Sequence, residues 1–248
     1  MLRCLGIIVF LLTPATHAIA QERSQPLKIH MISGSKEYKS EESLQAFSQF
    51  LEREYHVTCS ASWGRDGATQ LENLEALQDA ELMLIFARRM KLAEAQMAMI
   101  RKHWEAGKPI VGIRTAGHAF QSADNELFDR KVLGGHYAGH YGGEEVKVQN
   151  DPAAAAHPVL AEVGSFTSTK LYKAGELDPT TTVLQTGDIG KAKHPVTIVH
   201  EYNGGRTFFT SLGVPADFED PDFRRLLVNA VFWTTQRDPA TMKKPSSP

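Results

Sequence analysis

The run GIRTAGHAF, residues 112–120, follows the apolar stretch KPIV and has the pattern of a strand that turns sharply into a helix. In many α/β enzymes such a turn displays a nucleophile. Here the strand ends in Arg114, and His118 follows four residues later. An Arg side chain is a permanent cation with a planar fork of donors, suited to a carboxylate, a phosphate or a developing oxyanion. The turn therefore predicts a site that stabilises negative charge without supplying a nucleophile.

A second group of reactive side chains lies in GGHYAGHYGG, which carries His136, Tyr137 and His140 between two pairs of glycines. On a helix, the four-residue spacing would place both imidazoles on one face, as in zinc proteases. The glycines favour a loop, however, and no Glu follows His136. Two interpretations stay open: these residues and His118 bind a metal, or they form hydrogen bonds to loop backbone. We expect no resident metal and no cofactor.

Alternating apolar and amphipathic runs give the scaffold that positions these residues. Strands are expected at 27–33, 57–63, 81–87 and 108–114, with helices at 40–55 and 91–107. Continuous apolar strands separated by helices predict a parallel sheet covered on both faces. Further strands are expected at 144–149, 181–186, 196–202 and 207–212, with a hairpin turn at 203–205 and a last helix capped by Asp220.

We therefore predict one α/β domain over residues 27–235, with a doubly wound, mostly parallel sheet and an antiparallel C-terminal addition. Residues 237–248 are expected to be an unstructured tail because they are polar and lack apolar periodicity. In open parallel sheets, ligands bind beyond the carboxyl ends of the strands. That rule brings Arg114 and His118 together with Glu37, Tyr38 and Asp217. An alternative role for Arg114 is to pair with Glu37 or Asp217 and close the top of the sheet.

Four segments resemble the ThuA-like (trehalose utilisation) family, which has the class I glutamine amidotransferase-like fold, a relative of flavodoxin: ISGSKEYKSEESL, KPIVGIRTAGHAF, FDRKVLGGHYAGHYG and GGRTFFTSLGVPADFEDPDFRRLLVNAVFW. The resemblance covers residues 27–235. Matching the amidotransferase G-I-C to GIR places Arg114 at the position of the nucleophile. Val214 stands where ThuA-like proteins often have His in SLGHP. Both halves of a Cys–His pair are missing, so glutamine hydrolysis is excluded.

The resemblance implies carbohydrate metabolism, with a disaccharide or a keto derivative of one as substrate. A keto sugar can be cleaved after removal of the proton α to its carbonyl, which needs a base and a cation for the enolate oxygen. We expect the base to be His118, His136 or His140, and Arg114 to stabilise the oxyanion. Glu37 or Tyr137 would pass a proton to the leaving oxygen.

Tyr38, Tyr137 and Asp217 are the expected ligand-binding residues. A rival hypothesis from another class is a non-catalytic module that binds a sugar or a partner. A two-carboxylate glycosidase using Glu37 and Asp217 is a weaker alternative.

Residues 1–20 have the charged start, short apolar core and small-residue end of a secretory signal, so we expect cleavage after Ala20 and export to the periplasm or the extracellular space. The chain has 27 Lys and Arg against 29 Asp and Glu, and loss of Arg3 takes the net charge from −2 to −3. This balance gives no reason to expect binding to nucleic acid or, after cleavage, to membrane. Small carbohydrates are the expected partners, and homo-oligomerisation stays open. Cys59 is left as a single, inert thiol.

Overall fold

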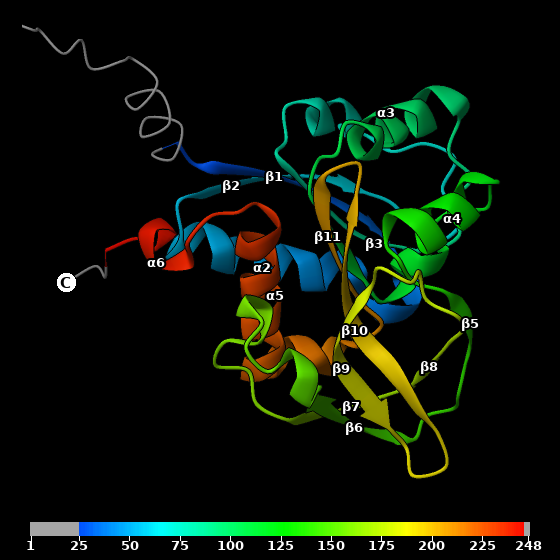
Figure 1. The fold of residues 1–248 in the computed structure, drawn as a ribbon. Helices are drawn as coiled ribbons and strands as arrows, with labels where there is room; N and C mark the ends of the chain where they lie inside the picture. Colours follow the sequence, from blue (N-terminus) through cyan, green and yellow to red (C-terminus); the bar gives the residue numbers. More distant parts are fainter. Residues whose placement is uncertain (1–24, 246–248) are drawn as a thin grey trace, which may run out of the picture.

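The apolar runs of the first half form parallel strands, as their composition predicts. The structure, a computed structural model, describes residues 25–245 (Figure 1). Five neighbouring strands run parallel in the order β2-β1-β3-β4-β11. Their bounds are β1 (Leu27–Gly34), β2 (Val57–Trp63), β3 (Leu82–Ala87), β4 (Ile110–Ile113) and β11 (Gly205–Thr210). All their carboxyl ends therefore meet at one edge of the sheet.

Four antiparallel strands extend this sheet beyond β11, in the order β10-β9-β6-β7. Their bounds are β6 (Glu145–Asn150), β7 (Phe166–Thr169), β9 (Thr182–Asp188) and β10 (Lys193–Tyr202). Asn203 and Gly204 connect β10 to β11 with φ of 50° and 81°, the backbone that a tight hairpin turn needs. The doubly wound, mostly parallel α/β class is confirmed. The antiparallel strands come from the middle of the chain, and the C-terminal strand β11 joins the parallel half.

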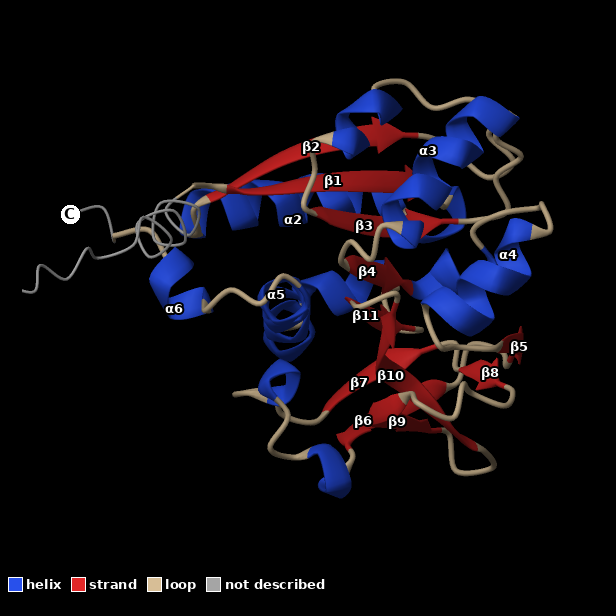
Figure 2. Ribbon diagram, turned by 45° about the horizontal axis from the view of Figure 1, so that its top comes forward, coloured by secondary structure: helices blue, strands red, loops and turns tan. Residues whose placement is uncertain are grey.

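Helices cover both faces of the parallel half (Figure 2). One core lies under α2 (Ser40–Glu54) and α5 (Pro221–Thr234), and the other lies under α3 (Glu94–Glu105) and the helical turn that follows the short α4 (Asp124–Leu127). Asp220 caps α5 by accepting from the backbone N–H of Asp222 and Phe223, as expected. Shorter helical turns are Lys36–Tyr38, Leu74–Gln78, Arg114–His118, Phe128–Val132, Pro152–Ala154, Pro158–Leu160 and Pro215–Glu219.

A separate two-stranded sheet, here called the ribbon, pairs β5 (Tyr137–His140) with β8 (Tyr172–Ala174). It lies beside β9 and β10 (Figure 1). The glycine-flanked histidine segment is therefore extended, and the helical arrangement of His136 and His140 does not occur. No helix within residues 25–245 is both long and apolar enough to cross a membrane. The expected signal at 1–20 lies outside the described residues.

The expected unstructured tail is wrong for residues 237–244. They include α6 (Pro239–Met242), and Met242 is buried. The backbone of His56 donates to the Met242 carbonyl at 2.7 Å, and Lys244 donates to the Glu54 carbonyl at 2.7 Å. Polar composition misled the prediction because backbone hydrogen bonds, which carry no compositional signal, fasten this segment.

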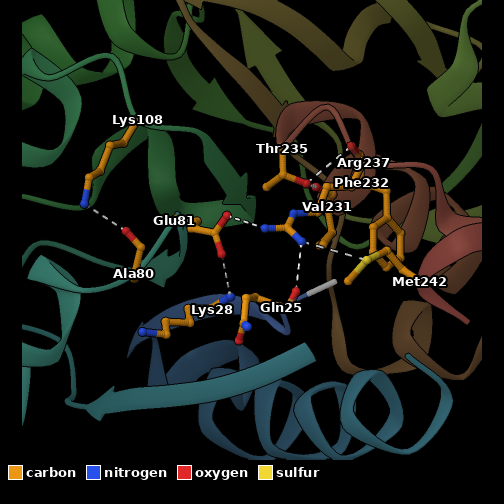
Figure 3. Close-up of polar contacts among 10 residues, drawn as sticks. All are labelled: Gln25, Lys28, Ala80, Glu81, Lys108, Val231, Phe232, Thr235, Arg237 and Met242. Atoms are coloured by element: carbon orange, nitrogen blue, oxygen red, sulfur yellow. Dashed lines mark hydrogen bonds and ion pairs between the residues drawn. The ribbon is translucent and has the colours of Figure 1, made fainter. Parts of the chain in front are cut away.

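Arg237 fastens the same segment to the start of β1 and to the turn before β3 (Figure 3). Its guanidinium donates to Glu81 Oε2 at 2.6 Å and to the Gln25 carbonyl at 3.1 Å. The other oxygen of Glu81 accepts from the Lys28 backbone N–H at 3.2 Å. The Arg237 side chain is only 11% exposed, whereas that of Glu81 is 43% exposed, so the guanidinium is the shielded partner of this charge-assisted pair.

We therefore expect Arg237→Ala to lower the free energy of unfolding by about 1.5–3 kcal/mol, because it removes the charged donor of the hydrogen bonds to Glu81 and to the Gln25 carbonyl. Urea denaturation followed by circular dichroism measures this loss. The matched control is Arg225→Ala, which breaks an exposed 3.5 Å pair with Glu162 and should cost under about 1 kcal/mol. Equal losses in the two variants would contradict the role given to Arg237.

Candidate functional site at the carboxyl edge of the sheet

The turn after β4 has the backbone of a nucleophile elbow. Arg114 begins the helical turn Arg114–His118 with φ of 47°, in the left-handed region that a residue with a Cβ adopts at a cost. Gly112 and Gly117 on either side are closely packed, and a Cβ on Gly117 would lie 2.9 Å from Asp129 Oδ1. The elbow predicted from the sequence therefore exists, and it displays an arginine.

The Arg114 guanidinium is clamped between two aromatic rings and two backbone carbonyls. Its Cζ lies 4.3 Å from the ring centroid of Tyr38 and 4.5 Å from that of Tyr172. Nη1 donates to the Ser211 carbonyl at 2.6 Å and Nη2 to the Lys170 carbonyl at 3.1 Å. The side chain is fully buried, and no carboxylate within residues 25–245 forms an ion pair with it. The predicted pairing of Arg114 with Glu37 or Asp217 is thus wrong.

Glu37 instead joins an ion-pair network at the surface of the site. Its carboxylate lies 3.4 Å from Arg88 Nη1 and 3.7 Å from Lys170 Nζ. Arg88 also holds Asp66 at 2.7 Å. These four residues follow strands β1, β2, β3 and β7, so charges from widely separated segments meet there. Arg88 and Lys170 are both partly exposed cations.

Asp217 does not face this network. It is 2% exposed, and its Oδ2 accepts from Ser168 Oγ and from the backbone N–H of Gly213 and Val214. Burial raises the pKa of Asp217, opposed by these three donors. Its role is to hold the turn after β11. The expected ligand-binding role of Asp217 and its pairing with Glu37 as in a glycosidase stay predictions.

The ribbon brings the predicted Tyr137, His140 and His118 together. The Tyr137 ring stacks on His118 at 4.1 Å between centroids, and its hydroxyl lies 3.1 Å from His140 Nδ1. Tyr172 packs against Tyr137 at 4.9 Å and against His118 at 5.8 Å. His140 is exposed, so the Tyr137–His140 pair is the part of this cluster that a ligand can reach directly.

His118 cannot serve as a base near neutral pH. Burial, together with the neighbouring cations Arg88, Arg89 and Arg114, lowers the pKa of His118 to about 3. Its ring is therefore neutral at pH 7 and able to donate or accept a hydrogen bond. Burial also raises the pKa of Tyr137 and of Tyr172, which keeps both phenols protonated.

His136 lies just before β5, with a half-buried ring. The backbone of Gly175 packs on the face of this ring, where an added Cβ would lie 2.3 Å from Nδ1. His136 Nδ1 is buried and has no hydrogen-bond partner among the described residues. Within residues 25–245, no three His, Cys, Asp or Glu side chains gather in a way that could hold a metal ion.

Asp129 is a buried carboxyl group that the sequence reasoning missed. Its Oδ2 accepts from the Tyr137 backbone N–H at 2.8 Å, and its carbonyl accepts from Gly135 at 2.8 Å. Oδ1 has no partner and packs against Gly117 and Gly135. Burial raises the pKa of Asp129 to about 6. Asp129 thus ties the elbow to the start of the ribbon.

Unpartnered buried polar atoms concentrate around the elbow. Of the ten such side-chain atoms in the described part of the chain, seven lie at the carboxyl ends of the parallel strands or next to the ribbon. They are Ser35 Oγ, Arg114 Nε, Thr115 Oγ1, His118 Nδ1, Asp129 Oδ1, His136 Nδ1 and Ser211 Oγ. Since buried polar groups are ordinarily satisfied, this edge of the sheet departs from the usual pattern.

The strand-end rule found most of the site. Arg114, Glu37, Tyr38 and His118 lie at this edge, and Tyr137 and His140 reach it through the ribbon. Lys170, Tyr172, Asp129 and Ser211 were missed. Lys170 and Tyr172 follow β7, in the antiparallel half to which the rule does not apply. Asp129 lies inside a helical segment, where sequence gives no sign that its side chain turns inward.

Comparison with known proteins identifies relatives of this architecture. The family model for ThuA, described as trehalose utilisation, matches residues 28–234. A solved structure of a ThuA-like protein from Bacteroides uniformis is 17% identical, with a TM-score of 0.66 over 87% of this chain and 96% of its own. A ThuA-like protein from Parabacteroides merdae is 14% identical, with a TM-score of 0.66 over 90% of this chain and 94% of its own.

A β-galactosidase from Bacillus circulans is 13% identical, with a TM-score of 0.57 over 86% of this chain and 32% of its own. At such identities the likeness shows the fold alone. No protein with curated annotation matches the chain.

Asp129 yields a prediction about pH. Its pKa is about 6 in the folded protein against 3.8 for the free group, so the folded state binds this proton more tightly. Its contribution to stability is therefore fully present below pH 4 and is lost between pH 4 and 6, by about 3 kcal/mol. Asp129→Asn keeps an acceptor for Tyr137 and cannot ionise. Between pH 4 and pH 7 the variant should gain about 3 kcal/mol relative to wild type.

Urea unfolding at pH 4, 5, 6 and 7 tests this, and comparing the two proteins cancels all other titrating groups. Parallel stability profiles for wild type and Asp129→Asn would contradict the burial cost assigned to this carboxylate.

Proposed function

The chain belongs to the ThuA family, and from this premise we propose that its carboxyl-edge site binds a disaccharide, or a keto derivative of one, and cleaves it by acid–base chemistry. The observation that carries the proposal is the concentration of unpartnered buried polar atoms around the elbow. Aromatic rings and a mixed set of charges surround them, which suits a polyhydroxy ligand that offers many hydrogen-bonding groups and apolar ring faces.

The proposed reaction begins with loss of the proton α to the carbonyl of a keto sugar. His140 takes this proton through Nε2, while its Nδ1 stays hydrogen-bonded to the Tyr137 hydroxyl. The enolate oxygen is stabilised by Arg88 and Lys170, which are partly exposed. Collapse of the enolate expels the glycosidic oxygen, which takes a proton from the Tyr137 hydroxyl, since Glu37 is a carboxylate ion-paired with Arg88 and Lys170. His118 remains neutral and donates or accepts a hydrogen bond.

Arg114 was expected to stabilise the oxyanion, and its contacts favour a structural role instead. Both of its terminal nitrogens already donate to carbonyls, and its side chain is fully buried. We therefore assign it to holding the loops in place, and the oxyanion role passes to Arg88 and Lys170. Glutamine amidotransfer is excluded because the elbow has no thiol. Burial raises the pKa of Cys59 to about 12, so this thiol is inert.

The second candidate is a module that binds sugar without turning it over. The specific observation in its favour is the same Arg114, since a clamped cation stands at the position where covalent chemistry would need a nucleophile. Both candidates require sugar binding at the ribbon, and only the first requires a base there.

We also propose that the chain is exported. The support is the signal pattern of residues 1–20. Expression of the full-length chain in a bacterium, followed by mass spectrometry of the released protein, should give an N-terminus at Gln21. Intact protein retained in the cytoplasm would overturn this.

The central experiment measures sugar binding by calorimetry and product formation with disaccharides and their keto forms. Wild type should cleave keto sugars, and His140→Asn should lower kcat by about 10²-fold or more with little change in binding, since it removes the base. The matched control is His56→Asn, another exposed histidine, which should leave both unchanged. Saturable binding with no turnover would establish the binding module, and no binding of any sugar would overturn both candidates.

A further inference from the structure

The loop after β3 carries two consecutive arginines next to the elbow. The backbone N–H of Arg88 donates to the Gly34 carbonyl at 3.0 Å, and that of Arg89 donates to the His118 carbonyl at 2.9 Å. Arg89 has a φ of 49°, in the left-handed region that a residue with a Cβ adopts at a cost. These bonds fix Arg89 beside His118, whose ring stacks on Tyr137. The loop therefore places two cations next to this stack.

The two arginines differ in what holds their guanidinium groups. Arg88 donates to Asp66 at 2.7 Å and lies 3.4 Å from Glu37. Arg89 is exposed, and its guanidinium has neither a hydrogen bond nor an ion pair with any residue in the range 25–245. The whole planar fork of Arg89 donors is therefore open to a ligand.

Lys170 adds a third cation from the segment that follows β7. Its Nζ lies 3.7 Å from Oε1 of Glu37, and Arg88 Nη1 lies 3.4 Å from Oε2 of the same carboxylate. Both separations exceed the hydrogen-bond length of about 2.7–3.2 Å, so Glu37 balances charge without occupying the donors of Lys170. Arg88, Arg89 and Lys170, here called the cationic face, thus converge with donors to spare.

The positive potential of the cationic face reaches the groups proposed to react. Burial raises the pKa of Tyr137 and lowers that of His118, and on both groups the charges of Arg88, Arg89 and Arg114 act to lower the pKa. The whole chain has a net charge of −2, so this positive potential is a local feature. Arg114 is fully buried, which leaves the cationic face as the part that a ligand can touch.

We propose that the cationic face binds an anionic group of the substrate, so that the site selects sugars bearing a carboxylate or a phosphate over neutral sugars. Arg89 is the specificity-determining residue, because its guanidinium fork matches a pair of oxygens of either anion and has no other partner. A neutral sugar would leave this guanidinium without a counter-ion. The inference rests on the proposed function in that the ligand is a sugar, whereas the anion site itself needs only the charge.

The test measures, by calorimetry at one ionic strength, the binding of trehalose, trehalose 6-phosphate and the uronic acid form of trehalose. Wild type should bind a charged form about 10-fold or more tightly than trehalose, as expected for a charge-assisted contact, and the form preferred identifies the anion. Arg89→Gln should bring this ratio close to one. Arg89→Lys, which keeps the charge, should retain most of the preference.

The matched control is Arg53→Gln, which removes the same charge from an exposed side chain near the end of α2 and should leave the ratio as in wild type. Equal affinity for charged and neutral forms in wild type, or a preference that survives in Arg89→Gln, would overturn the inference.

Titration with inorganic phosphate separates this inference from the proposed function. If no form of the sugar binds, phosphate binding that is lost in Arg89→Gln supports the anion site and refutes the proposed function, and absence of phosphate binding overturns both. Cleavage of neutral and charged keto sugars with equal efficiency would support the proposed function and overturn the selection of acidic sugars.

Discussion

A single buried cation organises the carboxyl edge of this sheet. Arg114 touches the loop after β1 through Tyr38, the end of β11 through the Ser211 carbonyl, and the start of the ribbon through Lys170 and Tyr172. Charge-assisted bonds and cation–π contacts gain strength where water is excluded, so this fully buried clamp holds segments that are far apart in sequence. Removal of the cation would take a donor from the buried carbonyl of Ser211 and from the partly buried carbonyl of Lys170.

This arrangement separates the elbow from the chemistry that such a turn usually performs. The backbone at Arg114 has the strained, left-handed geometry of a turn that presents a side chain outward. The Arg114 side chain is nevertheless buried in packing contacts. The more accessible polar groups therefore lie nearer the surface than Arg114, on the ribbon and in the ion-pair network of Glu37, Arg88 and Lys170. Stacking of Tyr137 on His118 connects the two layers, so the rigid elbow positions the more accessible His140 indirectly.

Sequence predicted the scaffold well because apolar runs and caps are local signals. The parallel strands, α2, α3, α5 and the turn at Asn203 follow from periodicity and turn chemistry, and the strand-end rule placed Arg114, Glu37 and Tyr38. The partners of Arg114 were not predictable, since two of its contacts are backbone carbonyls that any residue supplies. The burial of Asp217 was not predictable because a loop aspartate that captures backbone N–H groups looks, in sequence, like one that faces a ligand. The place of Tyr172 could not be predicted without knowing that the ribbon folds back over the carboxyl edge of the sheet.

The buried carboxylate of Asp129 lowers the stability of the folded protein at neutral pH. A charged group with one donor and a bare second oxygen destabilises the folded state at neutral pH, and an amide of the same shape would avoid that cost. Such a group persists where its charge or its proton has a use. Asp129 holds the backbone of Tyr137, whose ring and hydroxyl contact both His118 and His140. The cost of burying this carboxylate therefore falls at the base of the ribbon, where Asp129 holds the segment that carries Tyr137 and His140.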